Sequence, residues 1–68
     1  MIFGSKDSVL RKGYNYDAGV TVVEQKRNDG SIFTTVYIAC GPIMHGNGKT
    51  FEELCKECNV EAIKDLRN

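Results

Sequence analysis

The chain has no net charge, only one proline and no long run of apolar residues. Nine Lys and Arg balance nine Asp and Glu, so it lacks the basic excess of proteins whose affinity comes from neutralising phosphates. Nucleic-acid binding is therefore not favoured. The apolar stretch at the start of the chain is too short for a signal-peptide core or a spanning helix. We expect a cytoplasmic protein without membrane association.

Small size limits what the chain can do. A domain of 68 residues buries only about 60% of the surface that its unfolded chain exposes, which leaves little room for a deep substrate cavity. The composition is that of an ordinary globular protein, and we find no internal repeat, linker or low-complexity tract. Residues 1–68 are therefore predicted to form a single domain that folds alone or with a second copy.

The strongest local signal is a β-hairpin. Residues 19–27 and 31–40 are rich in β-branched and aromatic side chains, which suit a pleated surface. Asp29-Gly30 lies between them, and this pair favours a tight turn because Gly adopts positive φ without steric cost. The sequence therefore predicts two antiparallel strands joined at this turn.

The loop length decides which side chains share a face. A two- or four-residue loop places Val23 opposite Val36, whereas a three-residue loop with a bulge shifts this register. With the first option, Val23 and Val36 lie on one face together with Ile32, Ile38 and Cys40. The other face then carries Val20, Val22, Phe33, Tyr37 and Ala39.

Two further elements complete the expected fold. Residues 8–16 alternate in polarity and are predicted to form a third strand, interrupted by Gly13, with a turn at residues 17–19. Thr50 and Glu53 have the spacing of a capping box, which predicts a helix from Phe51. Its apolar stripe is Phe51, Leu54, Cys55, Cys58, Ala62 and Leu66.

This stripe favours one helix to about Leu66, although Asn59 offers a break into two short helices. The expected fold class is therefore α+β: a small antiparallel sheet of two to three strands in βββα order. The C-terminal helix or two short helices would pack on one face of that sheet.

The segment GPIMHGNGKT contains a resemblance to a known family. Gly48-Lys49-Thr50, between a strand and a helix, resembles the last three positions of the phosphate-binding loop of P-loop nucleotidases. However, Ile43 stands where that pattern requires Gly, and the preceding strand belongs to a hairpin rather than a βαβ unit. Nucleotide chemistry is not predicted. A capped helix start beside Lys49 remains as a candidate anion site.

The cysteines and the single histidine form the second motif. Cys40, His45, Cys55 and Cys58 have the number and type of ligands that tetrahedral zinc requires. The competing interpretation, which we favour, is that the cysteines are reduced thiols and partly core residues. We therefore predict no cofactor and treat the zinc set as an alternative. His45 has no partner arrangement for catalysis, so we do not expect an enzyme.

The predicted function rests on an apolar face of the hairpin that the predicted helix does not cover. Both faces of the hairpin are about half apolar, yet the sequence offers helix to cover only one. The other face, with Val20, Val22, Phe33 and Tyr37, is the candidate partner-binding surface. We expect a non-catalytic protein-binding module that acts as an inhibitor or regulator, either as a monomer or as a homo-oligomer. Its size alone suggests the small proteins that phages and mobile elements encode.

Two alternatives stay open. A nucleic-acid-binding or regulatory module would use cations, mostly from the basic N-terminal half: Arg11, Lys12, Lys26, Arg27 and Lys49. A zinc-stabilised mini-domain would use the cysteine and histidine set. Salt-sensitive binding to RNA or DNA would favour the former, and a zinc signal in metal analysis the latter.

Overall fold

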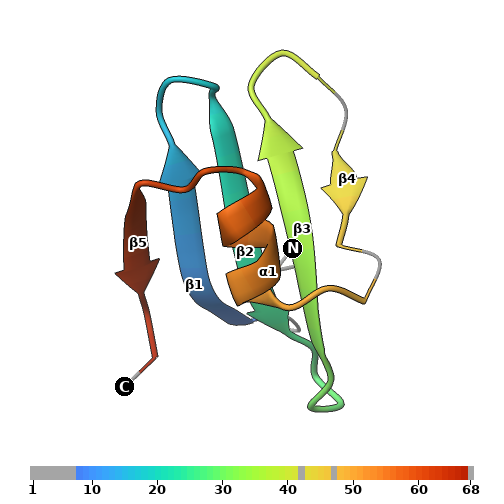
Figure 1. The fold of residues 1–68 in the computed structure, drawn as a ribbon. Coiled ribbons are helices and arrows are strands. Elements are labelled where there is room, and N and C mark those ends of the chain that lie inside the picture. The colour runs from blue at the N-terminus through green and yellow to red at the C-terminus, as the bar shows by residue number, and fades with distance from the viewer. Residues whose placement is uncertain (1–7, 42, 47, 68) are drawn as a thin grey trace.

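The computed structural model describes residues 8–41, 43–46 and 48–67. Within these residues, an antiparallel five-stranded sheet carries one helix (Figure 1). The elements are β1 (Ser8–Asn15), β2 (Val20–Lys26), β3 (Ile32–Ile38), β4 (Met44–His45), α1 (Phe51–Glu57) and β5 (Ala62–Asp65). The strand order is β4-β3-β2-β1-β5, so the last strand returns to pair with the first. In the described part of the chain, no helix is long and apolar enough to cross a membrane.

The predicted fold class is wrong in strand number and in the conformation of the chain after the helix. The sheet has five strands rather than two or three, and the chain after α1 forms β5 instead of more helix. Asn59 takes a positive φ of 54°. Val60 then donates its N–H to the Cys55 carbonyl at 2.9 Å, and Asn59 donates to Lys56. This is a Schellman motif, which ends the helix after two turns.

The new direction of the chain brings β5 against the outer edge of β1. Gly13 pairs with Ile63, and the Leu66 N–H donates to the Leu10 carbonyl at 2.8 Å. A Cβ atom at Gly13 would lie 2.9 Å from Cys55 Sγ and 3.0 Å from Val60 Cγ1. The glycine that interrupts the predicted strand therefore allows the end of α1 to approach the sheet closely.

The hairpin between β2 and β3 forms where the sequence predicts it, but with the three-residue loop. Arg27 donates its N–H to the Ser31 carbonyl at 2.8 Å, and Gly30 donates to Arg27 at 2.9 Å. Gly30 has φ 93°, as a glycine bulge requires. Val22, not Val23, is therefore opposite Val36, and the predicted faces of β2 are exchanged.

The helix covers the face that we call the inner face (Figure 1). Val22 and Phe51 are almost fully buried there, and Val36, Leu54 and Cys55 complete the buried core. The remaining contacts come from partly buried side chains at its margin: Val20, Ile38, Cys58 and Val60. Val20 and Val22, predicted to be partner-binding residues, thus belong to the packing between sheet and helix.

Candidate partner-binding surface

The opposite side of the sheet, which we call the outer face, has no described helix over it. Strand pairing and alternation place twelve side chains on this face. They are Val9, Lys12, Tyr14, Thr21, Val23, Gln25, Phe33, Thr35, Tyr37, His45, Ala62 and Lys64.

The charge of the outer face has one sign. Its strands carry Lys12 and Lys64, which are paired across β1 and β5. The Arg27 guanidinium lies over the Phe33 ring, 4.1 Å from the centroid, and adds a third cation beside this face. None of the twelve outer-face side chains is a carboxylate. A partner that carries negative charge is therefore electrostatically favoured here.

A shallow hollow of about 410 Å³ lies on this face, lined mainly by β1 and β2 residues together with Tyr37. At the centre of the face, Val23 and Thr35 are buried, whereas the Tyr37 side of the hollow is open, with Tyr37 39% exposed. Tyr14 stacks on Tyr16 with the ring centroids 5.7 Å apart. The hollow thus has an aromatic rim and a closed floor.

The structure separates the four residues predicted to bind a partner. Phe33 and Tyr37 lie on the outer face, while Val20 and Val22 lie on the inner face. Three further residues of this surface, Tyr14, Gln25 and Lys64, were not predicted from the sequence. Gln25 follows from the correct hairpin register, Tyr14 from the pairing of β1 with β2, and Lys64 from the pairing of β5 with β1.

The predicted basic set does not form a single patch. Arg11 lies on the inner face, where it binds Glu24 and Glu52. Lys49 binds Glu57, with 2.7 Å between Nζ and Oε2. Lys12 and Arg27 border the outer face, and Lys26 is exposed at the hairpin end of β2.

The candidate anion site at the helix start is already filled by the chain's own carboxylates. The Thr50 side chain accepts from the Glu53 N–H, and Glu53 Oε1 accepts from the Thr50 N–H at 2.8 Å. The nearby cation, Lys49, is bound by Glu57, and this contact raises the pKa of Lys49. The geometry therefore favours a structural cap over a ligand site.

The residues of the alternative zinc set are dispersed. Cys40 is exposed after β3, Cys55 is buried on the sheet-facing side of α1, and His45 lies on the outer face. In the described ranges, no three His, Cys, Asp or Glu side chains are grouped to hold a metal ion. Burial raises the pKa of Cys55, and burial together with the Glu57 charge raises that of Cys58. Both thiols are thereby held in the protonated form at neutral pH.

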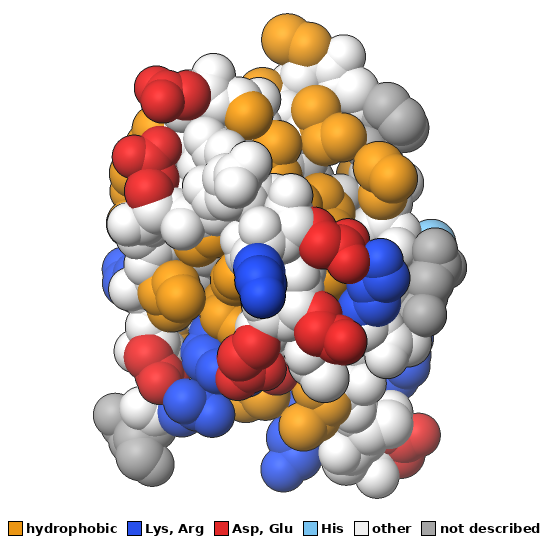
Figure 2. Space-filling view, in the orientation of Figure 1, with side chains coloured by type: hydrophobic (Ala, Val, Ile, Leu, Met, Phe, Trp, Pro, Cys, Tyr) orange, Lys and Arg blue, Asp and Glu red, His pale blue; other side chains and the backbone are white. Residues whose placement is uncertain are grey.

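The helix side of the molecule presents a second, smaller apolar area (Figure 2). A hollow of about 230 Å³ lies between α1 and the β3–β4 corner, lined by Val20, Ile38, Met44 and Leu54 among others. The Lys49–Glu57 ion pair borders it, and further charged side chains cover α1. Because both signs of charge surround it, this area lacks the single-sign charge that distinguishes the outer face.

No known protein family matches the chain, and neither a curated protein nor a solved structure matches it. The geometry of the outer face is therefore the basis on which function is inferred.

Proposed function

We propose that this protein is a non-catalytic protein-binding module whose outer face binds a carboxylate-bearing surface of a partner protein. In this proposal the module acts by occupying that surface, as an inhibitor or regulator does. One observation carries the proposal: along the described strands, the outer face combines aromatic side chains and cations with no carboxylate.

The residue types support a protein partner. Tyr, Phe and Arg are enriched in protein interfaces, and Tyr and Arg in the small set of residues that contribute most of the binding energy. The Arg27–Phe33 pair supplies these types at the hairpin end of the outer face, and Tyr37 supplies one near the other end of β3. Thr21 and Gln25 add hydrogen-bonding groups beside the hollow. A partner side chain that enters the hollow would contact Tyr37, Lys12 and these hydrogen-bonding groups.

The distribution of charge argues against nucleic acid as the partner. The chain as a whole has no net charge. Glu52, Glu53 and Glu57 are exposed on α1 on the other side of the sheet, and they would repel phosphates. Three cations beside one face provide little neutralisation along a phosphate backbone. They are sufficient, however, to complement an acidic patch on a protein.

The test begins with affinity capture on the immobilised protein, followed by purification and titration of each captured protein. We expect a one-to-one complex that weakens as salt rises. Lys12→Glu should weaken it by about tenfold, since it places a like charge within the interface. Lys56→Glu is the matched control, because Lys56 is exposed on α1 away from the outer face. It should leave the dissociation constant unchanged.

Two results would overturn the proposal. One is equal weakening of the complex by Lys12→Glu and Lys56→Glu, which would show that the outer face is not the interface. The other is binding of single-stranded RNA or DNA oligonucleotides at the outer face more tightly than any captured protein. That result would establish the nucleic-acid alternative instead.

A further inference from the structure

The outer edge of β3 is paired over only half of its length. β4 pairs with Thr35 and Val36, and the last bond of this ladder runs from the Gly46 N–H to the Thr34 carbonyl at 2.9 Å. Beyond Gly46 the chain leaves the edge and leads to the start of α1. Within the described residues, nothing pairs with Ile32 on this side of the sheet.

The hydrogen-bond pattern fixes the direction of the Ile32 main chain. Ser31 accepts from Arg27, and Ala39 donates to Gly19, so the odd-numbered residues of β3 face β2. The even-numbered residues face the other edge, as the Thr34 bond to Gly46 confirms. The N–H and C=O of Ile32 therefore both point away from β2, along the outer edge of β3. Ile32 as a whole is 58% exposed.

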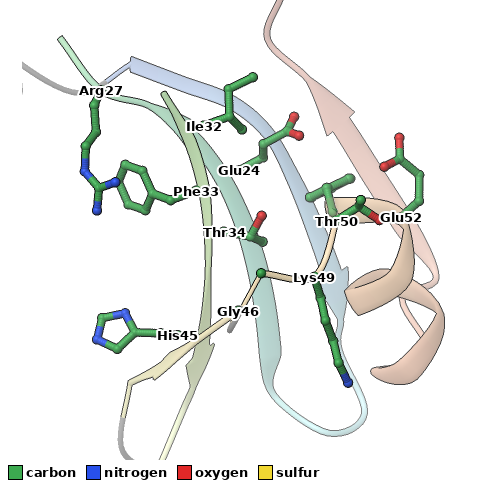
Figure 3. Close-up of a pocket in the computed structure, with 12 residues that line it drawn as sticks. Glu24, Arg27, Ile32, Phe33, Thr34, His45, Gly46, Lys49, Thr50 and Glu52 are labelled. Atoms are coloured by element: carbon green, nitrogen blue, oxygen red, sulfur yellow. The ribbon is translucent and has the colours of Figure 1, made fainter. Parts of the chain in front are cut away.

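A groove of about 540 Å³ runs beside this edge (Figure 3). Ile32, Phe33 and Thr34 form one wall, and His45, Gly46 and residues 48–52 form the other. Arg27 and Phe33 lie on one side of β3, with Thr34 on the other side. The groove therefore follows the strand edge and is accessible from both faces.

The groove favours negative charge in its occupant. Its two carboxylates, Glu24 and Glu52, are both bound by Arg11. Its cations are Arg27, which stacks on Phe33, and Lys49, which is bound by Glu57. An extended acidic segment would meet the main-chain groups of Ile32 and the Arg27 guanidinium beside the groove.

We propose that this groove binds an extended acidic peptide segment of a protein, which pairs with the Ile32 main chain as an added strand. An exposed strand edge offers main-chain hydrogen bonds to such a segment, and adjacent grooves accept its alternate side chains. This binding mode goes beyond the outer-face function, because it uses the edge of the sheet and does not require an outer-face partner.

The probe is a blocked peptide, acetyl-Glu-Val-Glu-Val-Glu-Val-amide, titrated into the ¹⁵N-labelled protein and followed by NMR. We expect saturable shifts of the Ile32, Phe33 and Thr34 amides. The Lys-Val peptide of the same length should bind about tenfold more weakly, because it reverses the charge. Shifts confined to other parts of the chain, or no saturation at about 1 mM peptide, would overturn the proposal.

Two proline variants separate the edge from the rest of the sheet. Ile32→Pro removes the outward N–H, and an edge strand tolerates proline where the N–H faces solvent. It should weaken the peptide by about tenfold or more. Ile63→Pro is the matched control, since the β1–β5 ladder places the Ile63 N–H on the opposite edge of the described sheet. Equal loss of binding in both variants would contradict the proposed site.

A third variant leaves the main chain unchanged and covers the case in which Ile32→Pro does not fold. Arg27→Glu reverses a charge at the groove and should weaken the Glu-Val peptide by about tenfold while improving binding of the Lys-Val peptide. If Arg27→Glu changed the affinity of neither peptide, the choice of an acidic peptide as the occupant would be refuted.

Discussion

Arg11 and Glu24 are joined by two hydrogen bonds across β1 and β2, with Nε–Oε1 at 2.7 Å and Nη2–Oε2 at 2.9 Å. Arg11 also donates to Glu52 of α1 and lies 4.4 Å from the centre of the Phe51 ring. Glu24 is only 8% exposed. One guanidinium thus neutralises a buried carboxylate and joins the helix to the sheet.

Replacing Arg11 should therefore lower the free energy of unfolding. Arg11→Met leaves the buried Glu24 carboxylate without its cation, and we expect a loss of about 3 kcal/mol in the free energy of unfolding, measured in urea. The double variant Arg11→Met with Glu24→Leu should recover most of this loss. Arg67→Ala is the control, since its pair with Asp65 is exposed and should cost less than about 1 kcal/mol. A similar loss for Arg11→Met and Arg67→Ala would contradict this role.

The close contact at Gly13 gives a second prediction. Gly13→Ala places a methyl group within 2.9 Å of Cys55 Sγ, and it should destabilise the protein by about 1–3 kcal/mol. In a Cys55→Ala background the Sγ atom is absent, so the same change should cost clearly less. Urea unfolding of the four proteins gives the coupling energy. Additive effects would show that Cys55 does not limit the approach of α1.

The helix cap gives a third prediction, independent of the sheet. Thr50→Ala removes the acceptor for the Glu53 N–H and should reduce the free energy of unfolding by about 1 kcal/mol. Thr50→Ser retains the hydroxyl oxygen and should remain close to the parent protein. If both variants were equally destabilised, the methyl group of Thr50 rather than its hydroxyl would be the important contact.

Acid should destabilise the protein through specific carboxylates. The Arg67 side chain, with the Arg67 N–H, lowers the pKa of Asp65 from 3.8 to about 2, and Arg11 lowers that of Glu52 below its usual 4.5. A folded-state pKa below the unfolded value stabilises the protein above the unfolded pKa. This contribution should be lost as pH falls from 4.5 toward about 2.

Asp65→Asn isolates one part of this effect. The variant should show a smaller fall in the free energy of unfolding between pH 4 and about 2, because it lacks one titrating group. The difference should be small, since Asp65 is exposed to solvent. A fall as steep as that of the parent protein would show that Asp65 does not contribute in this pH range.

Local chemistry explains the parts of the fold that the sequence predicts correctly. The Asp29-Gly30 turn and the capping box of Thr50 each depend on residues close together in the chain. Turn and cap residues act through their own main chain and are recognisable without tertiary information.

Tertiary pairing explains the parts that the sequence does not reveal. Ala62 and Leu66 fall on the helical stripe of Phe51 by spacing alone, but Ala62 belongs to a strand that exists because β1 has an open edge. Val60, which points away in a continuous helix, instead packs on the core after the Asn59 turn. The two-residue strand β4 likewise depends on its pairing with β3.

Of the four residues predicted to bind a partner, two lie on the outer face and two do not, and the hairpin register explains this division. Side chains alternate along a strand, so a shift of one residue in hairpin register moves a whole strand's set to the other face. The Asn28–Gly30 loop produces that shift, and it places Val20 and Val22 with the helix while Phe33 and Tyr37 stay together on the outer face.

The most direct test of the outer face is the dissociation constant of the captured protein partner for two matched variants. Tyr37 is 39% exposed on the outer face, and Met44 is 51% exposed on the helix side. We predict that Tyr37→Asp weakens binding by about tenfold or more, while Met44→Asp changes it by less than about twofold. Equal effects, or a larger loss for Met44→Asp, would contradict the outer face as the binding surface.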